Sequence, residues 1–175
     1  MPNTYCRSVE IKRLGGDDAA LLRDVRLRAL EDAPYAFSSW LAREADLPAA
    51  FWRDRVAESE AAKTGAVYVA LDDGRCVAMA GGFIADRQRG DAMLWGMWVE
   101  PSARSHGIGR QLVEAVAGWA REAGAKRLKL AVAQHEASRP AAALYRTLGF
   151  EETGESEPLE SDPSSVAVVM ARTLG

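Results

Sequence analysis

The feature that most constrains this chain is a pair of glycines placed between an apolar, strand-like segment and an amphipathic helix. They lie in the stretch MWVEPSARSHGIGRQLVEAVAGWA, residues 97–120. After the glycines, apolar residues recur at helical spacing: Ile108, Leu112, Val116 and Trp119. Glycines allow close approach of the backbone, and a helix N-terminus presents unpaired N–H groups and a positive dipole end. Gly107 and Gly109 therefore predict an anion-binding loop, with phosphate donors from Arg104, His106 and Arg110.

The residues around this loop decide between anion binding and other interpretations of the two glycines. The same sequence is also compatible with an ordinary helix N-terminus and solvated arginines, since an isolated Gly-x-Gly is only a weak indication of a binding loop. A dinucleotide fold requires a third glycine, where this chain has Leu112, and an acidic residue at the end of the next strand, where none occurs. The Lys-Ser/Thr pair of a nucleoside-triphosphate loop is also absent. The two nucleotide-binding interpretations are therefore disfavoured.

The remaining sequence alternates between strand and helix signals. Strands are expected at residues 7–14, 66–71, 76–84, 92–99, 127–132, 150–153 and 165–173, and helices at about 17–33, 48–59, 108–124 and 140–148. The first helix has an apolar face of Leu21, Leu22, Val25 and Ala29, and Arg23, Arg26 and Arg28 are expected to face away from it. The pattern predicts an α/β fold with a mixed, mostly antiparallel sheet of about seven strands, flanked by four helices.

Composition limits the classes of function. The chain has 175 residues and a formal charge of -3, which is the size of one domain (residues 1–175) without the basic surplus of a nucleic-acid binder. Cys6 and Cys76 are expected to be reduced thiols, and no metal-binding spacing occurs. No signal peptide or long apolar run is evident, so a cytoplasmic protein without membrane or nucleic-acid partners is expected.

The glycine loop resembles the pyrophosphate loop of the GNAT superfamily of acetyl-CoA-dependent N-acetyltransferases. That pattern is Q/R-x-x-G-x-G/A, and RSHGIG, residues 104–109, matches it. The preceding MWVEP, the downstream VAQHEASRPAAALYRTLGF and the early RLRALEDAPYAF also resemble family segments. The resemblance covers nearly the whole chain and implies the GNAT fold, with acetyl-CoA as acyl donor and no metal.

The resemblance also implies site residues. Cofactor-binding positions would be Met97, Trp98, Val99, Arg104, Ser105, His106, Gly107, Ile108, Gly109, Arg110 and Ser138. Ser138 stands where the family commonly has Asn, and its shorter side chain makes that contact a departure from the pattern. Tyr145, of the Leu-Tyr pair, would be the general acid for the leaving thiolate, although packing on a helix also explains a tyrosine there.

The acceptor side is less defined by the sequence. Phe37 and Trp40, on an expected loop, are the candidates for substrate binding, whereas Trp52 is expected in the core. No carboxylate lies between Met93 and Val99 that could take the proton of the acceptor ammonium. His135 and Glu136 are the two candidates for this general base, and the sequence does not favour either. The acidic run EETGESEPLESD, residues 151–162, is expected to be a solubilising loop, or, if it overhangs the site, to favour cationic amines.

The expected function is transfer of acetyl from acetyl-CoA to a primary amine of a small molecule or peptide, by direct attack. The alternative is a non-catalytic acyl-CoA-binding sensor with the same fold. A homodimer is an option by analogy with relatives.

Overall fold

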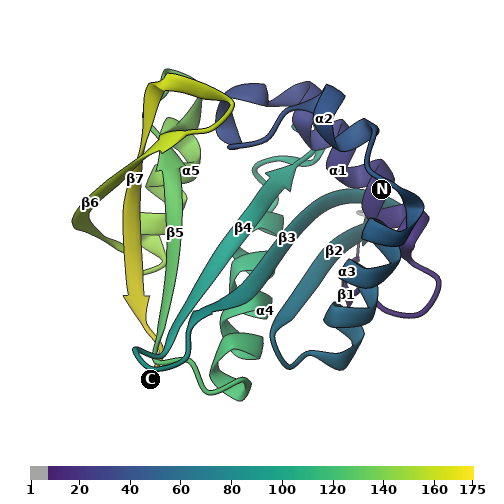
Figure 1. Cartoon of the computed structure of the whole chain (residues 1–175), viewed down its shortest axis with the longest axis horizontal. Coiled ribbons are helices and arrows are strands. Elements are labelled where there is room, and N and C mark those ends of the chain that lie inside the picture. Colours follow the sequence, from purple (N-terminus) through teal and green to yellow (C-terminus); the bar gives the residue numbers. More distant parts are fainter. Residues whose placement is uncertain (1–7) are drawn as a thin grey trace, which may run out of the picture.

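A computed structural model describes residues 8–175 and contains one seven-stranded sheet in the order β1-β2-β3-β4-β5-β7-β6 (Figure 1). The strands are β1 (Val9–Arg13), β2 (Gly65–Asp72), β3 (Arg75–Asp86), β4 (Asp91–Val99), β5 (Arg127–Ala133), β6 (Glu151–Leu159) and β7 (Asp162–Thr173). Only β4 and β5 pair in parallel, and the other neighbours are antiparallel. The predicted mixed, mostly antiparallel sheet is confirmed.

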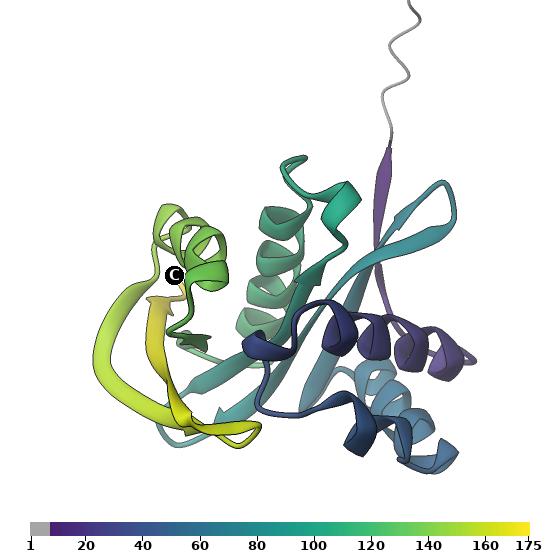
Figure 2. The ribbon, with the colours of Figure 1, turned by 90° about the horizontal axis from the view of Figure 1, so that it is seen from above.

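Five α-helices cover the two faces of this sheet. They are α1 (Ala19–Asp32), α2 (Leu41–Ala45), α3 (Ala49–Ala61), α4 (Ile108–Glu122) and α5 (Arg139–Thr147). Figure 2 shows α4 and α5 on one face and α1, α2 and α3 on the opposite face. Short 3-10 turns, η1 (Pro34–Ala36), η2 (Pro101–Ala103) and η3 (Glu136–Ser138), stand next to the helices. The helix that was not expected is α2, which has five residues in the segment predicted to be a loop.

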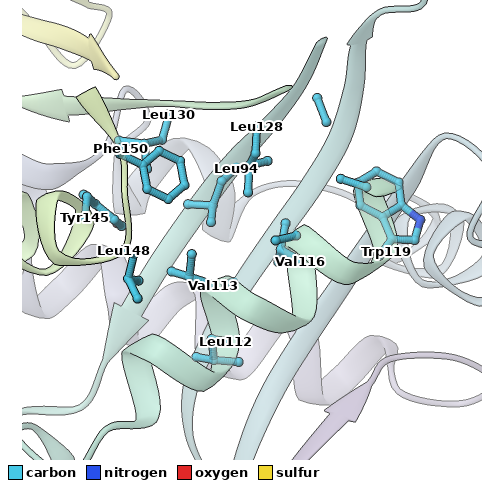
Figure 3. Packing of buried hydrophobic residues seen from close by; sticks show 14 of the residues in the cluster. Leu94, Leu112, Val113, Val116, Trp119, Leu128, Leu130, Tyr145, Leu148 and Phe150 are labelled. Carbon is cyan, nitrogen blue, oxygen red and sulfur yellow. The ribbon is translucent and has the colours of Figure 1, made fainter. Parts of the chain in front are cut away.

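Two hydrophobic clusters follow from these two layers. One joins α4 and α5 to the sheet through Leu112, Val116, Leu128 and Phe150, which are at most 2% exposed (Figure 3). The other joins α1 and α3 to the opposite face and includes Trp52, which is buried as expected. The apolar periodicity of α4 therefore predicted its core face correctly.

The turn chemistry accounts for the hairpins. Asp73 and Gly74 both have positive φ, 49° and 79°, and connect β2 to β3. Such a pair of left-handed residues matches the twist of a two-residue hairpin. Pro34 follows the end of α1 at Asp32, because the residue before a proline is pushed out of the α region.

Three expectations about orientation and extent were wrong. Arg26 does not face away from the α1 core: its side chain is buried against the sheet and pairs with Glu44 of α2. Arg28 is half-buried and donates to the carbonyl of Cys76 at 2.8 Å. The acidic run is not a loop, because most of it forms β6, whose side chains are exposed except for that of Leu159. Cys6 and Arg7 lie outside the described residues.

Candidate functional site

The site begins where β4 separates from β5. These strands pair only through Asp91–Met93 and Arg127–Lys129, and Figure 1 shows them diverging beyond that point. Near the split, Met79 pairs with Trp98 but Gly81 pairs with Trp95, so β4 contains an extra residue. Gly96 takes up this bulge with a φ of 63°, a conformation that favours glycine. The β4 backbone beyond Gly96 is thereby released from its parallel neighbour.

The glycine loop follows directly after β4. Ser105 and Gly107 both adopt left-handed conformations, with φ of 66° and 78°, and Gly107 is the N-cap of α4. The first N–H groups of a helix have no intrahelical acceptor, and alternating left-handed residues turn neighbouring N–H groups toward one point. These amides are arranged as an anion site would need, and binding of an anion by the loop stays a prediction.

Gly109 is needed for a different reason. A Cβ at this position would lie 2.8 Å from Met97 Cε and 3.0 Å from Leu144 Cδ2. The missing side chain lets the start of α4 lie close to β4 and α5. This close approach brings the three elements together around one cavity.

The cavity has a volume of about 530 Å³. Twelve of the residues considered from sequence line it: Phe37, Met97, Trp98, Val99, Arg104, Ser105, Gly107, Ile108, Gly109, Arg110, Ser138 and Tyr145. Tyr35, from the turn after α1, also lines it and stacks on His135, with ring centroids 4.6 Å apart. The fold thus gathers residues from three separate parts of the sequence, 33–37, 97–110 and 137–145, into one site.

Two candidate residues are placed outside this cavity. His106 does not line it, and its Nδ1 lies 3.3 Å from the carbonyl oxygen of Ala103. Trp40 is 45% exposed and packs against Arg43, whose Cζ is 5.4 Å from the indole ring. The sequence could not show where the His106 and Trp40 side chains point, because both depend on the path of a loop.

Arg104, predicted as a phosphate donor, uses much of its guanidinium group for hydrogen bonds within the protein. Its Nε donates to the Val99 carbonyl at 2.8 Å, and its Nη2 donates to Asp32 at 2.8 Å. Trp98 Nε1 donates to the same Asp32 oxygen at 2.9 Å. Asp32 therefore ties the end of α1 to both β4 and the glycine loop. The sequence did not predict a role for Asp32, because its partners Trp98 and Arg104 lie 66 and 72 positions away and no local pattern marks it.

Tyr145 combines burial with access to the cavity. It is 5% exposed, and its ring packs edge-on to Phe150 with centroids 5.8 Å apart. Burial raises the pKa of its phenol well above the ordinary value, because the charged phenolate would be poorly solvated. Within residues 8–175, no protein group forms a hydrogen bond with its hydroxyl. The hydroxyl thus keeps its proton and its donor capacity.

A second, smaller cavity of about 80 Å³ lies between the diverging strands. It is lined by Trp95, Gly96 and Met97 of β4 and by residues 130–133 of β5. Phe37, Ser138 and Tyr145 line both cavities. The two cavities therefore adjoin at these three residues.

The two candidate bases differ in their surroundings. His135 Nδ1 accepts a hydrogen bond from the Ala137 amide at 3.1 Å, which assigns the ring proton of the neutral side chain to Nε2. Neutral His135 then presents a donor, not a base, at its outer nitrogen. Glu136 is exposed and lines a third cavity, of about 620 Å³, beside α5 and β7. Neither geometry favours proton abstraction within the strand split.

Three of the six acidic residues in the acidic run, residues 151–162, form ion pairs with basic neighbours. Glu152 pairs with Arg146, Glu155 with Lys129 and Glu160 with Arg43, at 3.0, 3.0 and 3.2 Å. The turn that ends the run reaches the segment after α1, where Ser161 Oγ donates to the Phe37 carbonyl at 2.6 Å. Its charge is therefore a weak basis for selecting cationic amines.

Within the described part of the chain, residues 8–175, no group of three His, Cys, Asp or Glu side chains could hold a metal ion. The helices of that same part are all too short or too polar to cross a membrane.

Comparison with known proteins agrees with this geometry. The sequence profile of the Acetyltransferase (GNAT) family matches residues 26–150. An "IAA acetyltransferase" of Azospirillum brasilense is 37% identical over 90 residues, which are 51% of this chain and 58% of that protein. The chain thus aligns with little more than half of that relative's length.

Solved structures share the fold at low identity. A GNAT-family acetyltransferase from Streptococcus pneumoniae superposes with a TM-score of 0.78 at 20% identity, covering 96% of this chain and 100% of that chain. PaiA N-acetyltransferase from Thermoplasma acidophilum, solved in complex with coenzyme A, gives 0.74 at 16% identity, covering 95% and 99%. These two structures support the fold alone.

Proposed function

The chain belongs to the acetyltransferase (GNAT) family and is an acyltransferase, and on that premise we propose that it transfers acetyl from acetyl-CoA to a primary amine by direct attack. The acceptor is a small molecule or a peptide. The observation that carries the proposal is the single cavity onto which the glycine loop, the released end of β4 and Tyr145 all open.

The residues around the cavity fit a CoA-type ligand. The loop amides near Gly107 and Gly109 would hold the diphosphate, aided by the guanidinium of Arg110. The backbone of Met97, Trp98 and Val99 would hold the pantetheine arm. The amide groups of that arm can form hydrogen bonds with the backbone of β4 where this strand no longer pairs with β5. Arg104 acts here mainly by fixing the loop to Asp32 and Val99, because two of its nitrogens are already engaged.

The chemistry needs alignment and proton control more than a nucleophilic side chain. Acetyl-CoA supplies an activated thioester, which a neutral amine can attack without a covalent enzyme intermediate. Backbone N–H groups of the released β4 segment would polarise the carbonyl. Tyr145, kept protonated by burial, would donate its proton to the leaving sulfur. The proton of the acceptor ammonium leaves through water in this proposal, since no described carboxylate occupies the split.

An acetylation assay with a panel of amines and detection of products by mass tests this function. We expect stoichiometric release of free thiol with at least one amine, and calorimetric binding of both coenzyme A and acetyl-CoA. Binding without turnover on any amine would favour the acyl-CoA sensor, whereas absence of binding would contradict both functions.

A further inference from the structure

Arg26 is an unusual buried cation on the acceptor side of the strand split. Its residue exposure is 8%, and its Nε and Nη2 donate to Glu44 at 2.9 and 2.8 Å. Its Nη1 is buried and has no hydrogen-bond partner among the described residues. A buried donor without a partner is costly, so its retention calls for a physical reason.

The surroundings of Arg26 connect it to the smaller cavity. Its Cζ lies 4.8 Å from the ring centroid of Phe37 and 5.6 Å from that of Trp95, and both rings line that cavity. A Cβ built on Gly96, a third lining residue, would lie 3.5 Å from Arg26 Nη1. The unpaired nitrogen is therefore directly behind the cavity wall, on the α1 face of the sheet.

A second guanidinium stands against the same indole ring. Arg55 of α3 has its Cζ 5.1 Å from the centroid of Trp95 and 5.1 Å from that of Phe51. Arg55 is partly exposed, and no carboxylate of residues 8–175 forms an ion pair with it. Glu44 compensates Arg26 only, so the cluster of Arg26, Arg55, Phe37 and Trp95 keeps one positive charge. We call this cluster the basic aromatic wall.

Trp95 is fixed in place by the strand beneath it. A Cβ at Gly81 of β3 would lie 2.3 Å from the Trp95 ring, so the indole lies flat on the Gly81 backbone. This packing fixes the ring against which both guanidinium groups stand. The wall is therefore a built surface and not a chance meeting of mobile side chains.

We propose that the basic aromatic wall binds a carboxylate of the acceptor, so that the acceptor is an amine that also carries a carboxylate, in the manner of an apolar or aromatic amino acid. This inference rests on the proposed function and specifies its substrate class. Arg55, which solvent reaches, makes the direct contact with the carboxylate. Arg26, whose charge Glu44 largely offsets, supports the two rings from beneath and adds its unpaired Nη1 as a partial positive charge.

The test uses three amines that share a benzyl group and differ at the carboxylate: L-phenylalanine, L-phenylalaninamide and phenethylamine. We expect a higher kcat/KM for L-phenylalanine than for the other two. In Arg55→Gln, the ratio of kcat/KM for the acid to that for its amide should fall about tenfold or more, the effect of one charge-assisted hydrogen bond. Arg53→Gln, an exposed neighbour on α3, is the matched control and should keep the wild-type ratio.

A second variant tests Arg26 without leaving Glu44 as a lone buried charge. The double substitution Arg26→Met with Glu44→Met replaces the pair by apolar side chains of similar length. A cooperative melting transition would show that this variant is folded. We then expect the ratio of kcat/KM for the acid to that for the amide to fall as well, by less than in Arg55→Gln, because Glu44 already offsets most of the Arg26 charge.

Two outcomes separate this inference from the proposed function. Preference of the wild type for the amide or for phenethylamine would overturn the inference and leave N-acetyl transfer intact. Failure to acetylate any amine would overturn the function, and calorimetry on the CoA complex would then decide the inference. Binding of L-phenylalanine but not phenethylamine would uphold it, and binding of neither would overturn it.

Discussion

Individual side chains carry the chemistry of this chain, and their surroundings decide what each can do. Tyr145 is buried and keeps its proton, whereas Arg104 has lost much of its freedom to Asp32 and the Val99 carbonyl. Both residues belong to patterns visible in the sequence. The properties that matter, a raised phenol pKa and an occupied guanidinium, come from residues far away along the chain.

Replacing Tyr145 by Phe should lower kcat by about 100-fold or more, which is typical for loss of a positioned general acid. KM for acetyl-CoA should stay near the wild-type value, because the phenol is proposed to act on the leaving sulfur and not in binding. Steady-state thiol release with the best amine of the panel measures both. Since burial raises the pKa of Tyr145, wild-type activity should show no loss from its ionisation up to about pH 10. An unchanged kcat in Tyr145→Phe would remove this residue from the mechanism.

Helices and strands set the site by how closely they approach one another. The start of α4 meets β4 and α5 at Gly109, and the bulge at Gly96 turns β4 away from β5. Arg172 of β7 ties the same helix to the sheet, because it donates to Glu114 at 2.7 Å and to the Leu148 carbonyl at 2.9 Å.

Two glycines of α4 provide a matched pair. Gly109→Ala should push the Met97 and Leu144 side chains into the cavity and raise KM for acetyl-CoA roughly five- to tenfold, about 1 kcal/mol. Gly118→Ala meets no atom within 4 Å, so it should stabilise the protein by about 0.5–1 kcal/mol without changing KM. Thermal melting and kinetics on both variants check this, and equal KM values would contradict the close approach at Gly109.

The Glu114–Arg172 pair should make stability depend on pH at the acid end. The Arg172 hydrogen bond lowers the pKa of Glu114, so its stabilisation is full above the unfolded value of about 4.3 and is lost as pH falls through the lowered folded pKa. Glu114→Gln should melt a few degrees below wild type at pH 6, corresponding to less than about 1 kcal/mol for this half-exposed pair. The gap should close below about pH 4.

Glu122→Gln, on the same helix and exposed, serves as the control. It should show no such gap at either pH. A difference between wild type and Glu114→Gln that persisted at pH 3 would assign the stabilisation to packing instead of charge.

The whole molecule consists of two helical layers on a sheet that is split on one side. The larger cavity beside the glycine loop and the smaller cavity within the split share lining residues, among them Phe37 and Tyr145. A ligand bound across these elements should stabilise all of them together.

Acetyl-CoA should therefore raise the melting temperature of the protein. A free concentration of 100 times Kd adds about 2.7 kcal/mol to the free energy of unfolding, which is roughly 5–10 °C for a chain of this size. Differential scanning fluorimetry measures the shift, with ATP and NAD as comparison ligands. A larger shift with either nucleotide would contradict the assignment of the glycine loop to CoA.

Much of this architecture was predictable, because its signals are local. Helical spacing placed the core face of α4, and Asp73–Gly74 marked a hairpin. The turn before α4 could be predicted from Gly107 and Gly109, since the conformation of a short loop depends mainly on its own residues, and its binding of an anion stays a prediction. The exceptions were α2, a helix of five residues without clear periodicity, and the length of β6, which pairs with β7 and continues to Leu159 beyond the strand predicted at residues 150–153.

The sequence by itself determined most of the strands and helices and the glycine loop before α4, because those outcomes depend on side-chain periodicity and on glycine near the residue concerned. Only the tertiary structure decided that Arg26 turns inward to Glu44, that Asp32 holds Arg104 and that His106 and Trp40 face elsewhere. Those contacts join residues 18 and 72 positions apart, and their energies exist only once the layers have packed.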